Sequence, residues 1–169
     1  MYISLSCILV YFRLIYFYYD RQLSCYMLYD CQKTGGMIKK MKLDGFGIFV
    51  EDMAVMVRFY RDVLGFEIKE DENTTNVYLE KDGTLFLLYR RSDFEKMTNR
   101  EFNYAKAING HYEIALSVEN FDAVDSTFQE IVSKGATPVL EPTTETWGQR
   151  TCYIADPEGN LIEIGSFSQ

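Results

Sequence analysis

Two segments of the chain follow the same order of residues, and this internal repeat limits the possible fold more than any other feature of the sequence. Val50-Glu51-Asp52 opens one copy and Val118-Glu119-Asn120 opens the other. In each copy an alternating apolar strand precedes the opening, an amphipathic helix follows it, and a glycine turn leads into a second apolar strand. A repeat of this length indicates a duplicated supersecondary unit, and two such units can enclose a site that neither forms alone.

The strands before the two openings each have one bulky face and one small or polar face. Within residues 43–50 and 113–118, large apolar residues occupy one face of each strand. The opposite face carries Gly45, Gly47 and Phe49 in the first strand and Glu113, Ala115 and Ser117 in the second, and Phe49 is the one large apolar residue among them. The bulky face must pack on the helix of its own unit, because a half-buried strand alternates in this way. We therefore expect a sheet with one covered side and one open, concave side.

The remaining pattern predicts an α+β fold built from tandem βαβββ units over about residues 41–91 and 110–166. Asp52 and Asn120 are predicted N-caps of the two helices, since both side chains can accept a backbone N–H. The turns at residues 82–83 and 156–159 each join two antiparallel strands. Residues 92–110 are a polar and aromatic connector, with a helical piece predicted at 93–98.

The first 36 residues do not belong to the repeat, and the composition changes abruptly at Met37. We expect residues 1–36 to be upstream sequence translated in error or a dispensable leader, and residues 37–169 to form a single domain that folds without them. The apolar run from Ile3 to Tyr19 leaves a membrane anchor open as the alternative, although it is short for a span and carries Arg13. Otherwise no membrane partner is expected.

Charge and cysteine content exclude several classes of function. The net charge of −8 argues against a nucleic-acid partner, which requires clustered Lys and Arg. Four cysteines without a Cys-x-x-Cys pair are typical of a reduced, cytoplasmic protein. His111 is the single histidine, which excludes a multi-histidine metal site. The sequence contains no phosphate-binding loop and no nucleophile elbow, and we assign no catalytic residue.

The tandem unit, closing on Asp156-Pro157-Glu158-Gly159-Asn160-Leu161-Ile162-Glu163-Ile164, resembles the vicinal oxygen chelate superfamily. That superfamily includes glyoxalase I, extradiol dioxygenases, fosfomycin-resistance enzymes and bleomycin-resistance proteins. The helix end from Phe59 to Phe66 is similar to the same family's first unit, and the resemblance covers residues 41–166. It implies that the two units pair into a cupped mixed sheet, with the helices outside and the site inside.

The resemblance also implies four places where catalytic members hold a divalent metal, on the first and last strands of each unit. Here those places are Gly45, Leu87, Glu113 and Glu163, of which Glu163 alone matches the usual ligand type. Catalytic Zn sites generally have three protein ligands, and two carboxylates without imidazole hold such metals weakly. We expect no cofactor. If a divalent metal binds, Glu113 and Glu163 are its expected ligands, and His111 is expected at the rim.

The expected ligand-binding residues share the concave face, and they are Phe49, Leu87, Tyr89, Glu113, Trp147, Arg150 and Glu163. Trp147 beside acidic groups suits a flat or cationic ligand. The Trp-Gly-x-Arg pattern at 147–150 also resembles bleomycin-resistance proteins. Two alternatives stay open at this point. Trp147 packs in the core, or Arg150 neutralises Glu113 and Glu163 as a structural ion pair.

These observations favour a metal-free protein of the bleomycin-resistance type that binds a cationic or aromatic small molecule. The alternative is a metal-dependent enzyme of the same superfamily, of the glyoxalase, lyase or dioxygenase kind, and a third class is a sensor or protein-interaction module. The missing ligands at Gly45 and Leu87 favour binding over catalysis. We also expect a homodimer, because the family commonly pairs units between chains and exposed sheet edges need covering.

Overall fold

The structure is a computed structural model, and it describes residues 42–169. The expected leader and the alternative membrane anchor lie outside the described residues. Residues Asp44–Gln169 form one compact unit that holds both repeats. In this part of the chain no helix has the length and apolar character needed to cross a membrane.

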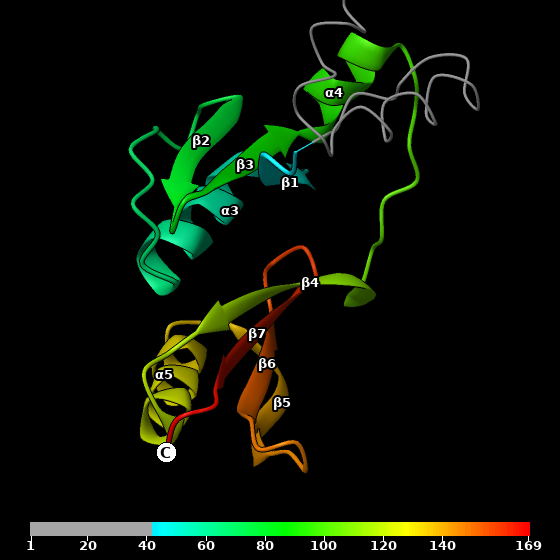
Figure 1. Ribbon diagram of the computed structural model, residues 1–169. Coiled ribbons are helices and arrows are strands. Elements are labelled where there is room, and N and C mark those ends of the chain that lie inside the picture. Colours follow the sequence, from blue (N-terminus) through cyan, green and yellow to red (C-terminus); the bar gives the residue numbers. More distant parts are fainter. Residues whose placement is uncertain (1–41) are drawn as a thin grey trace, which may run out of the picture. The chain divides into compact units, whose positions relative to one another are not determined.

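The first repeat is a three-stranded mixed sheet with a short helical segment. In chain order it contains β1 (Gly45–Val50), α3 (Met53–Arg58), a π-helical turn η1 (Phe59–Val63), β2 (Asn76–Lys81) and β3 (Thr84–Arg90). The strand order is β1-β3-β2, with β1 parallel and β2 antiparallel to β3 (Figure 1). The predicted βαβββ pattern is one strand short in this repeat, because residues 64–75 form no strand. Residues 67–75 are mostly charged or polar, which disfavours a buried strand.

The second repeat has the full βαβββ pattern. It contains β4 (Asn109–Ser117), α5 (Phe121–Ser133), β5 (Thr137–Thr144), β6 (Arg150–Ala155) and β7 (Asn160–Ser166), in the sheet order β4-β7-β6-β5. The helix α4 (Arg91–Thr98) lies between the repeats and confirms the helical piece predicted in the connector. The mixed α+β fold expected from the sequence is therefore present.

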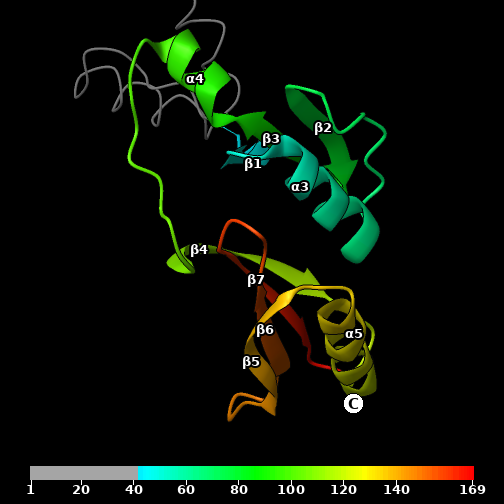
Figure 2. The ribbon, with the colours of Figure 1, turned by 180° about the vertical axis from the view of Figure 1, so that it is seen from behind.

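Each helix covers one face of its own sheet, and Figure 2 shows α3 and α5 in these positions. The side chains of α3 and α5 that face the sheets are fully or nearly fully buried, and they are Met53, Met56 and Val57 in the first repeat and Val124, Phe128 and Ile131 in the second. Burying one such side chain stabilises the fold by roughly 1.5–3 kcal/mol. Asp52 accepts from Val55 N–H and Asn120 from Ala123 N–H, so both predicted caps are confirmed.

Strand register confirms that the repeats are equivalent. Gly47 pairs with Leu87 in the first sheet, and Ala115 pairs with Glu163 in the second, so Leu87 and Glu163 occupy the same place in their units. Ile114 and Leu116 pack against the core, whereas Glu113, Ala115 and Ser117 are exposed. The predicted division of these strands into a covered and an open face is therefore present.

Candidate functional site

The open face of the second sheet carries a polar network centred on Glu163 of β7. Gln149 Nε2 donates to Glu163 Oε1 at 3.1 Å, and Thr151 Oγ1 donates to the same oxygen at 2.9 Å. Gly165 permits this arrangement, because a Cβ at that position would come within 2.6 Å of Gln149 Nε2. Neutral donors thus hold one oxygen of the Glu163 carboxylate, and among residues 42–169 no ion pair involves this carboxylate.

Tyr153 connects the second acidic residue to the same face. Its hydroxyl group donates to Glu113 Oε2 at 2.9 Å, and its Cα lies opposite that of Glu163 in the β6–β7 register. Burial raises the pKa of the Tyr153 phenol well above its ordinary value, and the hydrogen bond to Glu113 and the charge of Glu163 raise it further. Tyr153 therefore remains a hydrogen-bond donor over the whole physiological pH range.

Trp147 belongs to this network rather than to the core. Its side chain is 63% exposed, which is incompatible with the core-packing alternative. The indole Nε1 donates to Gln149 Oε1 at 3.0 Å, and Gln149 in turn holds Glu163. A hydrogen-bonded chain thus fixes an exposed aromatic ring near a carboxylate that has no protein cation beside it in the described part of the chain.

Arg150 lies away from the open face, so its predicted place among the ligand-binding residues is corrected. Its Nε donates to Asp125 Oδ1 at 2.7 Å, and Asp125 belongs to α5, on the covered side of the sheet. Strand alternation explains the placement, because Arg150 shares a face with the buried Cys152 and Ile154. Arg150 consequently does not neutralise Glu113 or Glu163, and the structural ion pair that it forms is with Asp125.

The open face of the first sheet is aromatic rather than polar. Phe49 on β1 is 38% exposed, and its ring centroid lies 6.3 Å from that of Tyr89 and 4.2 Å from that of Phe94 on α4. The ring of Phe102 follows 5.2 Å beyond Phe94. Leu87 on β3 lies between Gly47 and Tyr78 in the sheet. Phe49, Leu87 and Tyr89 therefore lie in one sheet, while Glu113, Glu163 and Trp147 lie in the other repeat.

The four places where the family would hold a metal do not fit a catalytic metal. A Cβ at Gly45 would come within 2.5 Å of the Leu85 carbonyl oxygen, so no side-chain ligand can be accommodated there without a backbone shift. Leu87 offers no donor atom, and Glu113 and Glu163 already accept hydrogen bonds. Within residues 42–169, no group of three His, Cys, Asp or Glu side chains is placed to hold a metal. His111 is exposed, on the irregular part of β4 before Glu113.

The turn at residues 156–159 has a role that the sequence did not predict, because it binds the first repeat. Asp156 is 2% exposed, and it accepts from the backbone N–H groups of Glu158 and Asn160 and from the hydroxyl of Tyr60. Glu158 Oε1 accepts from the backbone N–H groups of Glu51 and Asp52, at 2.8 and 2.9 Å. The turn therefore fixes the start of α3 from the second repeat.

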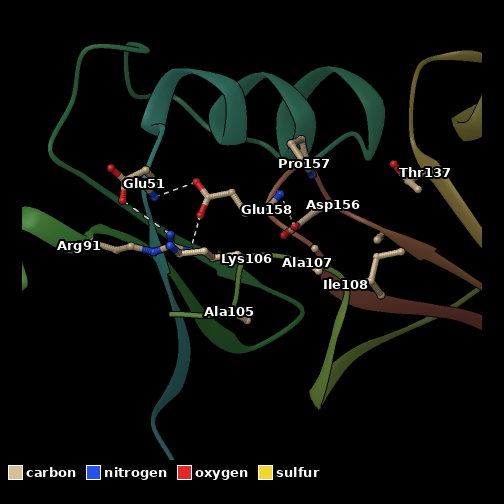
Figure 3. Close-up of a pocket in the computed structure, with 12 residues that line it drawn as sticks. Glu51, Arg91, Ala105, Lys106, Ala107, Ile108, Thr137, Asp156, Pro157 and Glu158 are labelled. Carbon is tan, nitrogen blue, oxygen red and sulfur yellow. Dashed lines mark hydrogen bonds and ion pairs between the residues drawn. The ribbon is translucent and has the colours of Figure 1, made fainter. Parts of the chain in front are cut away.

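A cavity of about 420 Å³ lies beside this turn (Figure 3). The charged residues that line it are Glu51, Arg91, Lys106, Asp156 and Glu158. Burial raises the pKa of the Glu158 carboxyl, although the two N–H groups and Arg91 act in the opposite direction. Three of the charged residues, Glu51, Arg91 and Glu158, contact one another (Figure 3), and these contacts join the two repeats.

Comparison with known proteins identifies the family to which the chain is similar. The model of the Glyoxalase/Bleomycin resistance protein/Dioxygenase superfamily matches residues 42–164. A virulence protein of Salmonella typhimurium is 25% identical over 129 residues, which covers 75% of this chain and 84% of that protein.

Two solved structures of similar fold illustrate the range of the relatives. A glyoxalase/bleomycin resistance protein/dioxygenase from Nocardioides has a TM-score of 0.69 at 14% identity, over 85% of this chain and 93% of that one. A lactoylglutathione lyase from Agrobacterium tumefaciens has a TM-score of 0.57 at 21% identity, over 75% of this chain and 93% of that one. At these identities the structures share the fold, and the activity does not follow from them.

Proposed function

The chain belongs to the Glyoxalase/Bleomycin resistance protein/Dioxygenase superfamily, and from this premise we propose that it is a small-molecule binding protein that holds a cationic or aromatic ligand without a metal. The observation that carries the proposal is the set of hydrogen-bond partners of Glu113 and Glu163. Both carboxylates accept hydrogen bonds from neutral donors, and neither forms an ion pair within residues 42–169. A ligand cation would supply the missing positive charge.

The chemistry of the open face defines the ligand class further. One oxygen of each carboxylate accepts the hydrogen bonds described, which favours a ligand whose N–H groups reach the other oxygen. The exposed ring of Trp147 supplies a face for an aromatic group or for the cation itself. An aromatic ring carrying a protonated amine combines both features.

The experiment uses a matched set of ligands. 2-Phenylethylamine is protonated at neutral pH, 2-phenylethanol has the same shape without the charge, and 2-cyclohexylethylamine keeps the charge without the aromatic ring. Calorimetric titration of the full chain should show the tightest binding for 2-phenylethylamine. Binding that is equal for the amine and the alcohol would contradict the role of the carboxylates.

A metal-dependent enzyme of the glyoxalase, lyase or dioxygenase kind is the second candidate. Glu163 supports it, because this residue has the expected ligand type at the expected place, and a lactoylglutathione lyase shares the fold. Elemental analysis of the purified protein separates the two candidates. Stoichiometric Zn, Ni, Fe or Mn would overturn the proposal of metal-free binding, whereas substoichiometric metal supports it.

We propose further that the protein is a homodimer in a reducing, cytoplasmic compartment. The first strand of each repeat, β1 or β4, lies at a sheet edge, and exposed edges favour pairing with another chain. Cys152 is free and buried, as in a protein that needs no disulfide. Light scattering at micromolar concentration should give twice the mass of the chain, and a strictly monomeric protein would contradict the dimer.

A further inference from the structure

Arg91, the first residue of α4, contacts three separate segments of the chain. Its side chain is 16% exposed, and its Nε donates to the carbonyl oxygen of Phe49 at 3.1 Å. Nη2 pairs with Glu158 at 2.7 Å and Nη1 with Glu51 at 3.6 Å. The guanidinium carbon also lies 4.5 Å from the centroid of the Tyr104 ring. Lysine cannot reproduce these contacts, because they require several donors on a planar group.

Glu158 completes the arrangement from the second repeat. One oxygen accepts the N–H groups of Glu51 and Asp52, and the other pairs with Arg91. Figure 3 shows the contacts with Glu51 and Arg91. Glu158 is therefore bound on one side to the segment that leads from β1 into α3, and on the other side to the start of α4. A single side chain of the second repeat thus holds the backbone just after Phe49 and, through Arg91, the start of α4.

The relative position of the Phe49 and Phe94 rings depends on the contacts of Arg91. Phe49 precedes Glu51 by two residues, and its carbonyl oxygen is held by Arg91. Phe94 follows Arg91 by one turn of α4, and its ring lies 4.2 Å from that of Phe49. Movement of Arg91 would therefore change both the backbone of Phe49 and the ring that packs against it.

We propose that Arg91, held by Glu158, is a positioning residue that sets the geometry of the Phe49–Phe94 pair for an aromatic ligand. The inference rests on the proposed binding function and deepens it, because it adds an aromatic contact from Phe49 and Phe94 to the one proposed for Trp147, and couples that contact to the turn of the second repeat. A merely structural ion pair would instead affect every ligand equally through the stability of the fold.

The test compares two ligands on Arg91→Met, which keeps an apolar stem of similar length and removes the donors. Binding of 2-phenylethanol should weaken about threefold to tenfold, the effect of a displaced aromatic contact. Binding of 2-cyclohexylethylamine should change less than about twofold, because its charge is recognised by Glu113 and Glu163. Arg91→Lys should lie between Arg91→Met and the wild type.

Two further variants keep the test decisive. Glu158→Gln retains an oxygen for the N–H groups but loses the charge, and it should give a smaller effect in the same direction. Arg61→Met is the control, because Arg61 pairs with Asp62 and Glu72 and has no described contact with the aromatic pair. Equal weakening of both ligands by Arg91→Met, or no weakening of either, would overturn the role of Arg91. A wild-type protein that binds neither ligand would instead contradict the proposed function itself.

Discussion

The Tyr153 hydroxyl group donates to Glu113 at 2.9 Å across the open face of the second sheet, and in doing so joins β6 to β4 over the intervening strand β7. The pair places a neutral donor against a carboxylate, on the face that also carries Glu163. Because the pKa of Tyr153 is raised, its phenol stays protonated and adds no negative charge to this face.

The first prediction concerns the ionisation of Tyr153. Its phenol is partly buried and donates a hydrogen bond to Glu113, so its pKa is raised and it should not ionise with ordinary tyrosines, whose pKa is about 10. Tyr153→Phe and the wild type should therefore gain the same absorbance at 295 nm up to about pH 11. A smaller gain in the variant below that pH would show that Tyr153 ionises normally.

The second prediction uses Glu158, whose pKa is raised mainly by burial. A carboxyl with a higher pKa in the folded state binds more protons there than in the unfolded state. Its contribution to stability therefore falls as the pH rises from the unfolded value of 4.5 through the higher folded value. Urea unfolding should show the wild type losing stability relative to Glu158→Gln over this interval. A constant difference between pH 4.5 and pH 7 would contradict the raised pKa.

Tyr60→Phe tests the buried join between the repeats. The Tyr60 hydroxyl donates to Asp156 Oδ2 at 3.1 Å, and Asp156 has almost no access to solvent. Loss of a hydrogen bond to a buried carboxyl group should lower the free energy of unfolding by about 1–3 kcal/mol. Tyr78→Phe is the matched control, since Tyr78 is 55% exposed, and it should change stability by less than about 0.5 kcal/mol. Equal effects of the two substitutions would show that the Tyr60 contact adds nothing.

Trp147 is the single tryptophan of the chain, so its fluorescence reports on the proposed site alone. Because the ring is 63% exposed, emission of the free protein should resemble that of tryptophan in water. Saturation with 2-phenylethylamine should shift the emission to shorter wavelength, as the ligand removes water from the ring. Binding detected by calorimetry without any change in emission would place the ligand away from Trp147.

The sequence allowed the fold and much of the open face to be predicted, because these features depend on local patterns. Alternation over residues 113–118 correctly separated Glu113 from the core side of its strand, and the glycine turns correctly aligned Leu87 with Glu163. The same alternation could have shown that Arg150 shares the covered face with Cys152. The Trp-Gly-x-Arg motif instead groups Arg150 with Trp147, because a motif carries no information on strand faces.

Other site residues could not be predicted from local pattern. Gln149 and Tyr153 matter through partners on neighbouring strands, and the apolar run around Cys152 hid the polar face of β6. Glu158 gave no signal beyond its place in a turn, since its partners Glu51 and Arg91 lie in the other repeat. Contacts of this kind depend on how the two sheets meet, which hydrophobic periodicity does not encode.

The most direct measurement is the affinity of Glu163→Gln for 2-phenylethylamine and for 2-phenylethanol, with the exposed Glu119→Gln as the control. Our account predicts that Glu163→Gln weakens binding of the amine about tenfold or more, because a charged hydrogen-bond partner typically contributes about 1.5–3 kcal/mol. Binding of the alcohol should stay within about twofold of the wild type, and Glu119→Gln should alter neither affinity. Equal losses for amine and alcohol, or unchanged binding of the amine, would contradict the claim that Glu163 recognises a cation.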